Sequence, residues 1–162
     1  MAVIKGGDLM LFIESGSDSS LTKKSIAFAT NHTLNISADT KETSSKDSGG
    51  LWQTSEIGIL SWTVSSENLY ADTGAGYGYD ELFAMMVARK PIKVVFGIEG
   101  DSTDLNEGKL GQAPVGGWKP KVGNGYEGSV IITGLSKNAP NGENATFTVD
   151  FTGVGELKKL GE

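Results

Sequence analysis

Along much of the chain, apolar and polar residues alternate one by one, which is typical of β-strands with one buried face. The longest such stretch covers residues 25–40. One parity of it carries Ile26, Phe28, Thr30, His32, Leu34, Ile36 and Ala38. The pattern predicts either one very long strand or two strands of about six residues joined by a tight turn at Asn31-His32. Both interpretations give a sheet with one apolar and one polar face.

Further strands are predicted before and after this stretch. Residues 8–14 form a continuous apolar run, which indicates a strand covered on both faces. Residues 58–71 alternate again, and residues 92–99 form a shorter apolar segment. Residues 128–135 and 144–157 flank the turn sequence NAPNG at 138–142, so they predict an antiparallel hairpin. In the last strand one face carries Phe147, Val149 and Phe151, and the other carries Thr146, Thr148, Asp150 and Thr152.

Residues 80–90, DELFAMMVARK, have helical periodicity instead. Leu82, Met85 and Met86 follow the spacing of one helix face, acids stand at the start, and Pro91 ends the segment. The pattern therefore predicts six or seven strands and one helix. We expect residues 1–162 to form a single, mainly β domain, which is a β-sandwich or partly closed barrel with one flanking α-helix.

An unusually long connection separates the strands at residues 25–40 and 58–71. It opens with a polar run, turns through Gly49-Gly50 and presents Trp52. A hairpin loop needs only about two to five residues, and disordered segments are poor in aromatic residues. We therefore expect an extended arm at about residues 41–56 that becomes ordered against another surface. A second segment, residues 99–128, is rich in Gly, Asp and Asn and is expected to be mostly a long loop.

The composition restricts the possible partners. The chain has 162 residues and a formal net charge of −6, so its surface does not attract the phosphates of nucleic acids or anionic lipids. It has no cysteine, which excludes disulfides and thiol chemistry. The apolar run at residues 9–13 is too short for a signal peptide or a membrane span. We expect a protein made in the cytoplasm.

No set of residues predicts an enzyme. The GAGYG sequence before the helix has the spacing G-x-G-x-G rather than the G-x-G-x-x-G of a dinucleotide site. The loop around Asp104 lacks the terminal bidentate acid of a calcium loop. His32 is the only histidine, and we interpret it as a turn residue or a hydrogen-bonded residue at the edge of the core. Asp150 has no identifiable partner for acid–base catalysis, so we expect no catalytic residue, no cofactor and no metal.

The three tryptophans differ in their sequence context. Trp62 stands in a predicted strand and is expected in the core, whereas Trp52 and Trp118 stand in predicted loops. An indole in a loop packs onto its own domain or is buried at an interface, where tryptophan is enriched. One function consistent with these two residues is a monomeric β-sandwich that binds carbohydrate or peptide.

Four short sequences, in a fixed order, resemble a known family. They are KDSGG at 46–50 followed by Trp52, SWTVS at 61–65, the helix with its proline at 80–91, and FTGVGEL at 151–157. Their order along nearly the whole chain resembles that of the major tail tube proteins of long-tailed bacteriophages and related prophages. The same architecture occurs in the tube proteins of contractile tails and of type VI secretion.

The resemblance implies a structural protein without catalysis. Six copies would form a ring, and rings would stack into a tail tube through which DNA passes without specific binding. In the family a long loop between early strands reaches a neighbouring subunit or ring. The resemblance gives this contact to Lys46, Asp47, Gly49, Gly50 and Trp52. The candidates for the face that lines the lumen are Thr146, Thr148, Asp150 and Thr152, with an outer solvated face as the alternative.

The resemblance also implies partners and a location. Besides itself, the subunit would contact the tape-measure, tail-tip and terminator proteins, and no membrane. It would be made in the bacterial host cytoplasm and would end in the tail of the virion. Two rival functions remain: the monomeric binding module, and a small enzyme that uses the GAGYG turn. Such an enzyme needs a bound nucleotide and a parallel sheet.

Overall fold

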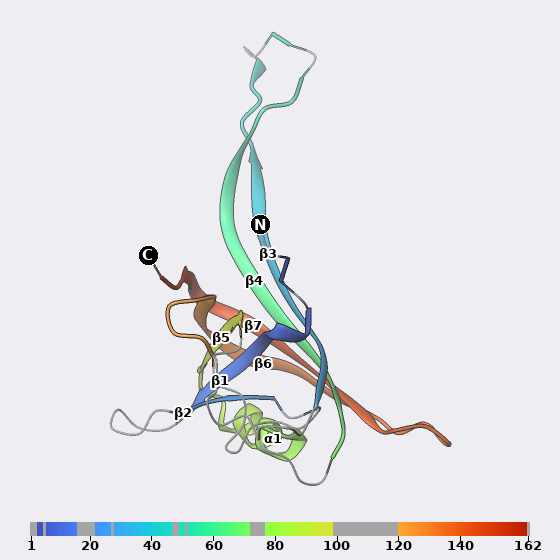
Figure 1. The fold of residues 1–162 in the computed structure, drawn as a ribbon. Helices are drawn as coiled ribbons and strands as arrows, with labels where there is room; N and C mark the ends of the chain where they lie inside the picture. The colour runs from blue at the N-terminus through green and yellow to red at the C-terminus, as the bar shows by residue number, and fades with distance from the viewer. Residues whose placement is uncertain are drawn as a thin grey trace.

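A computed structural model describes residues 3–4, 6–15, 22–26, 28–46, 49–50, 52–71, 77–98 and 120–161. Within them lie one short 3₁₀ helix, one α-helix and seven strands (Figure 1). In chain order these are η1 (Gly6–Asp8), β1 (Leu9–Ser15), β2 (Thr22–Ser25), β3 (Ala29–Glu42), β4 (Ser55–Leu69), α1 (Tyr79–Ala88), β5 (Ile92–Ile98), β6 (Tyr126–Asn138) and β7 (Thr146–Lys159).

The seven strands belong to one sheet, in the order β2-β1-β5-β6-β7-β4-β3. Every pair of neighbouring strands is antiparallel. Although four strands separate them in this order, β1 and β3 contact each other, so the sheet curls without closing. The prediction of a mainly β fold with six or seven strands and one flanking helix is confirmed.

The main core lies on one face of this curled sheet. Alternate residues of five strands, with Ile26, Tyr77 and Leu82 of α1, form one continuous cluster of buried side chains. At one end of it Tyr70, Tyr79 and Phe147 meet edge to face, with ring centroids 5.8–6.5 Å apart. Such edge-to-face pairs stabilise packing beyond the area that they bury. They fix the start of α1 against β4 and β7.

Strand β1 is covered on both faces, as its continuous apolar sequence predicted. Leu11, Phe12 and Ile13 are all fully buried. Leu11 and Ile13 belong to the main core, whereas Phe12 points to the other face and lies opposite buried Val95 of β5. Since successive side chains of a strand point to opposite faces, three buried residues in a row require cover on both sides.

The long alternating stretch forms one strand from Ala29 onward rather than a hairpin. Asn31 and His32 lie inside β3, paired with Glu67 and Ser66 of β4, so the alternative with a turn at these two residues is wrong. The break comes earlier, at Phe28, whose φ of 55° lies in the left-handed region. Neither Asn31 nor His32 has a positive φ, and the tight two-residue hairpin turns require one.

At the arm, β3 and β4 are longer than the sequence predicted. The pairing of β3 and β4 continues to Glu42 and Ser55, so only residues 43–54 connect the two strands. The hairpin of β6 and β7 is present with NAPNG at its tip. Of the predicted 99–128 loop, residues 99–119 lie outside the described residues, and β6 begins at Tyr126.

Candidate functional site

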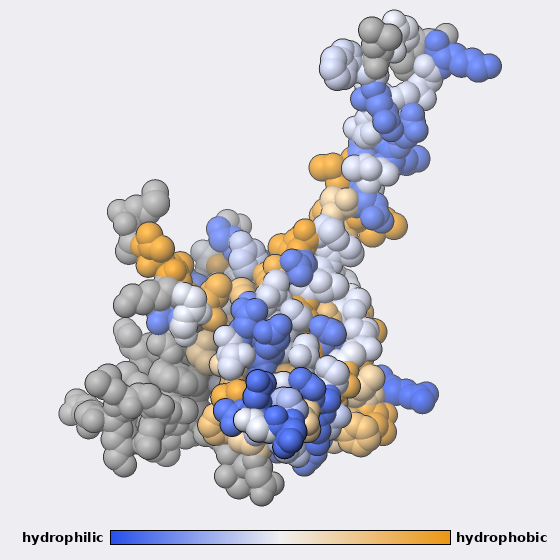
Figure 2. All heavy atoms as spheres, turned by 90° about the vertical axis from the view of Figure 1, so that its right-hand side faces the viewer, coloured by the Kyte–Doolittle hydropathy of each residue, from blue (hydrophilic) through white to orange (hydrophobic). Residues whose placement is uncertain are grey.

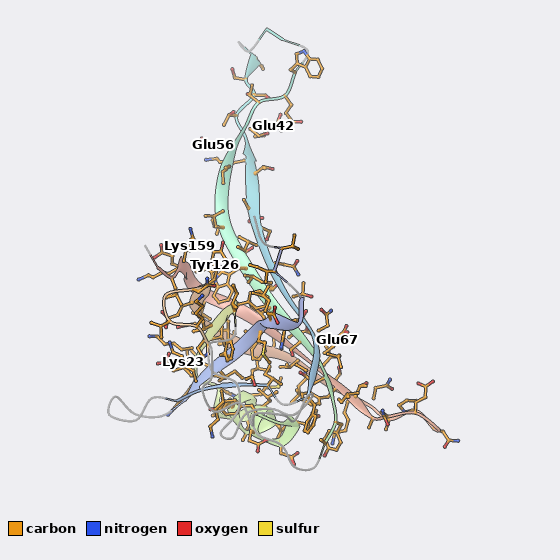
Figure 3. All side chains as sticks on the ribbon, viewed as in Figure 1. Lys23, Glu42, Glu56, Glu67, Tyr126 and Lys159 are labelled. Atoms are coloured by element: carbon orange, nitrogen blue, oxygen red, sulfur yellow. The ribbon has the colours of Figure 1, made fainter. Side chains whose placement is uncertain are left out.

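The outer halves of β3 and β4 form an arm that projects from the body of the molecule (Figure 1). We define the arm as residues 35–61. All of its described residues are exposed, whereas the next residue, Trp62, is only 5% exposed. Figure 3 shows Glu42 and Glu56 along the arm and Glu67, on the same strand as Glu56, at the body. A two-stranded ribbon in water is marginally stable at best, so this arm gains stability from any surface that covers it.

One face of the arm is apolar and continues the core face of the sheet. Residues that lie opposite each other in an antiparallel pair share a face. Ile36 lies opposite Trp62, Ala38 opposite Leu60, and Thr40 opposite Ile57. The side chains of Ile36, Leu60 and Ile57 are 58%, 68% and 74% exposed. We call these three residues the apolar strip. Figure 2 shows apolar residues along the arm below a mostly hydrophilic tip.

The other face of the arm is mostly polar, although Ile59, which shares the parity of Ser61, is 76% exposed there. The hydroxyl groups of Ser37 and Ser61 lie 2.9 Å apart and share a hydrogen bond. Further out, Lys41 Nζ and Glu56 Oε1 form an exposed ion pair at 4.0 Å. These contacts hold the two strands together but bury almost nothing. The arm is therefore amphipathic, and its apolar strip is the face that lacks cover within the described chain.

The tip of the arm carries most of the residues predicted to contact a neighbouring subunit. Lys46, Gly49, Gly50 and Trp52 are exposed, and the Trp52 side chain is 88% exposed. Asp47 lies outside the described residues. At the base of the tip, the Thr43 amide donates to the Thr54 carbonyl at 2.9 Å, and the Thr54 amide donates to Ser44 Oγ at 2.9 Å. The tip is thus closed by its own hydrogen bonds, while its indole makes no buried contact.

A second candidate surface is the polar face of the sheet, across β3, β4 and β7. The register places Thr148, Asp150 and Thr152 beside Glu67, Ser65 and Thr63 of β4. The same β4 residues lie opposite Asn31, Thr33 and Asn35 of β3. Thr146 continues the parity at the start of β7. The four residues predicted on one face are brought together there, and Thr133 Oγ1 joins Thr152 Oγ1 at 3.1 Å.

The part of this polar face at the body carries charge of one sign. Among the residues from Asn31 to Asn35 on β3, from Thr63 to Glu67 on β4 and from Thr146 to Thr152 on β7 that share this face, the charged side chains are the carboxylates of Glu67 and Asp150. Asp150 is exposed, whereas Thr146, Thr148 and Thr152 are half-buried. A surface of hydroxyls, amides and two carboxylates repels polyanions weakly and offers phosphates no cationic partner.

Two of the short sequences that resemble the family meet at Trp62. Its indole Nε1 donates to the carbonyl oxygen of Gly155 at 3.0 Å. A Cβ on Gly153 or Gly128 would lie 2.2 or 2.5 Å from an indole carbon, so no side chain fits at either position. Gly155 has a φ of 80°, a conformation that favours glycine. The SWTVS and FTGVGEL sequences thus form one packing site, which periodicity alone did not reveal.

His32 occupies an environment that the sequence did not predict. It lies in β3, half-buried, and lines an open-sided pocket of about 260 Å³ with Gly6, Gly7, Leu9, Met10 and Ala29 to Asn31. His32 lies inside a strand, so its interpretation as a turn residue is wrong. Among the described residues neither ring nitrogen has a hydrogen-bond partner, contrary to the alternative of a hydrogen-bonded residue. Burial lowers the pKa of His32 from 6.5 to about 4.

The remaining candidate sites are only partly described. Residues 74–76 of GAGYG, the loop around Asp104 and Trp118 lie outside the described residues. Gly78 is the N-cap of α1, and its amide donates to Glu81 Oε2 at 3.0 Å. The strand after α1, β5, pairs only in antiparallel fashion, unlike the strands of a dinucleotide-binding unit. The part of the chain that the structure describes contains no group of three potential metal ligands and no helix long and apolar enough to span a membrane.

Comparison with known protein families gives a match over nearly the whole chain. The family model described as "Phage tail tube protein" matches residues 3–159. The chain belongs to the phage tail tube protein family. The resemblance predicted from the four short sequences is thereby confirmed, and the protein is a structural subunit of a tail tube. No curated protein matches the sequence significantly.

Several solved structures share this fold. The tail of an empty gene transfer agent particle, refined with C6 symmetry, has a TM-score of 0.66 and 15% identity, covering 97% of this chain and 98% of that chain. The SPP1 tail tube has a TM-score of 0.64 and 12% identity, and the match covers 98% of this chain and 80% of that chain. The baseplate of the anti-feeding prophage, 6-fold symmetrised, has a TM-score of 0.55 and 9% identity, and the match covers 99% of this chain and 97% of that chain.

Proposed function

We propose that six copies of this tail tube subunit form a ring and that the rings stack into the tube through which DNA passes. The six-fold symmetry of the gene transfer agent tail, which has the same fold, supports this number. The observation that carries the proposal is the arm, because its described residues are exposed while one of its faces is apolar. A soluble monomer rarely exposes such a surface without a partner.

The arm supplies the contact between copies. Trp52 at the tip is a large, rigid apolar group, and residues of this type dominate the energy of many interfaces. Lys46, Gly49 and Gly50 accompany it at the tip, and Asp47 follows Lys46 in the sequence. We assign these five residues to the surface that meets a neighbouring subunit. Trp52 alone at the tip does not make the rigid aromatic platform of a carbohydrate or peptide site, which weakens the rival binding module.

The open sheet supplies a second kind of contact. Its two edges are β2 and the 14-residue β3, and each has one side without a partner strand in the described chain. Unpaired strand edges are templates for pairing with another chain, and a closed ring of identical copies satisfies them. Ring closure therefore uses sheet edges, and stacking uses the arm.

The polar face of the sheet lines the lumen in this proposal. Thr146, Thr148, Asp150 and Thr152 present hydroxyls and one carboxylate, and the formal net charge of the chain is −6. Like charge prevents passing DNA from adhering. DNA passes through the tube without specific binding. The tube catalyses no reaction and contacts the tape-measure, tail-tip and terminator proteins. The subunit is synthesised in the host cytoplasm and ends in the virion.

Assembly of the purified chain tests this function. We expect rings and tubes in negative-stain images at high protein concentration or after addition of a tail tip. Deletion of residues 44–53 removes Trp52 and most of the tip, so it should abolish tubes while leaving the circular dichroism spectrum and thermal midpoint of the monomer nearly unchanged. A chain that stays monomeric with and without a tail tip would contradict the proposal. Unfolding of the deletion variant would show instead that the tip belongs to the core.

A further inference from the structure

Helix α1 has an outer face with no charged or hydrogen-bonding side chain after its first turn. Phe83, Met86 and Val87 are 54%, 36% and 61% exposed, and Leu82 is the fully buried residue of the helix. Residues at spacings of three and four lie on the same side of a helix, so these three form one patch. We call them the helix patch. An outward helix face normally carries charged residues, so this one is suited to a partner surface.

The apolar strip and the helix patch lie at opposite ends of the molecule. Figure 1 shows the arm leaving the body at one end and α1 at the other. Neither surface can therefore reach the other within one chain. A repeating stack in which all copies point the same way brings the arm end of one copy to the opposite end of another. Such head-to-tail contacts join two different patches of the same protein.

The two surfaces also match in length and chemistry. The ten-residue helix is about 15 Å long, at about 1.5 Å per residue. The strip runs from Ile36 to the level of Thr40, which spans about 13 Å at about 3.3 Å per residue. Both are apolar in the middle and charged at an end: Arg89 and Lys90 follow the helix, and Glu42 lies beyond Thr40 on the same face as the strip. The nearby Lys41 and Glu56 pair with each other on the polar face of the arm.

We infer that the apolar strip of the arm docks on the helix patch of a second copy of this chain in the adjacent ring. This inference rests on the proposed stacking of rings and names the surface that receives the arm. It buries the exposed face of the two-stranded ribbon, which has little stability alone. It also explains why α1 has an apolar outer face, although it packs on the core through Leu82.

Disulfide trapping tests the contact directly, because the chain has no cysteine of its own. Tubes of the double variant Leu60→Cys/Val87→Cys should give a ladder of linked chains on a non-reducing gel after oxidation. The matched control is Ser61→Cys/Val87→Cys, because Ser61 lies on the polar face of the arm beside Leu60. The control should give no ladder. Tubes of the first variant without a ladder, or equal ladders in both variants, would overturn the inference.

A second variant separates docking from folding. Val87→Lys places a charge on the helix patch, and it should raise the concentration needed for tube formation at least about tenfold. Its thermal midpoint as a monomer should stay within about 2 °C of the parent, since Val87 is exposed. Normal assembly of the variant would contradict the inference. So would a lowered thermal midpoint, because it would show that Val87 is covered by its own chain. Failure of the proposed function itself would be seen in the unmodified chain, which would form no tubes.

Discussion

Strand β4 passes through two regions with opposite requirements. From Ser55 to Ser61 it belongs to the arm, where all side chains are exposed. From Trp62 onward, alternate residues are buried, and Trp62 fills a slot between two glycines. The pairing with β3 continues through both regions, with a bulge on the arm. Backbone pairing is therefore the same kind of interaction in the arm and the body, and side-chain burial makes the difference. We therefore expect the body to be stable in one chain and the arm to need cover from a second chain.

The largest difference between body and arm is expected from substitution of two tryptophans. Trp62→Ala removes a 5% exposed indole and its hydrogen bond to Gly155, so the free energy of unfolding should fall by about 3–5 kcal/mol. Trp52→Ala at the 88% exposed tip should leave it within about 0.5 kcal/mol and should weaken tube formation instead. Urea unfolding of both monomers, with imaging of assembly, makes the measurement. Equal losses of stability would show that the tip packs on the body.

The sequence predicted the body better than the arm, and the reason is periodicity. Alternation predicted the strands whose faces are buried and exposed in turn, such as β7. On the arm Leu60 and Ile57 share a face although three positions separate them, because the pairing with β3 shifts register between Ala38 and Thr40. A bulge of this kind leaves no clear pattern in the sequence. Residues 41–56 were therefore predicted as the arm, whereas the strands reach into it at Lys41–Glu42 and Ser55–Glu56.

The slot of Trp62 shows a second limit. Trp62 comes from β4, and the residues around it come from β6 and β7. They are far away in the sequence: Gly128 is 66 positions and Gly155 is 93 positions from Trp62. Glycines in strands indicate close approach of another group, but the sequence does not say which group approaches. Likewise, the assignment of Lys46, Gly49 and Gly50 to a contact surface rests on the family resemblance, since nothing in their chemistry separates a docking tip from a solvated turn.

Acid should weaken the body of the molecule through His32. The pKa of His32 is about 4 in the folded chain against 6.5 unfolded, so the unfolded state binds the proton first as pH falls. The contribution of neutral His32 to the free energy of unfolding is fully present well above pH 6.5. It should fall by about 2–3 kcal/mol as the pH decreases to 4. The variant His32→Gln cannot titrate, and it should lose this part of the pH dependence in urea unfolding between pH 7 and pH 4. An unchanged pH profile in the variant would assign the effect to other groups.

Two lysines provide the smallest and most direct comparison of the regions. In the body, Lys137 Nζ lies 4.1 Å from the ring centre of Tyr70 and 4.3 Å from that of Tyr79. On the arm, Lys41 pairs with Glu56 in water. Lys137→Met should reduce the free energy of unfolding by about 0.5–1 kcal/mol, because it removes attraction to two rings. Lys41→Met should have no measurable effect, because exposed ion pairs contribute little. The reverse order in thermal unfolding would mean that the arm stabilises the monomer, and the division between a self-sufficient body and a partner-dependent arm would then fail.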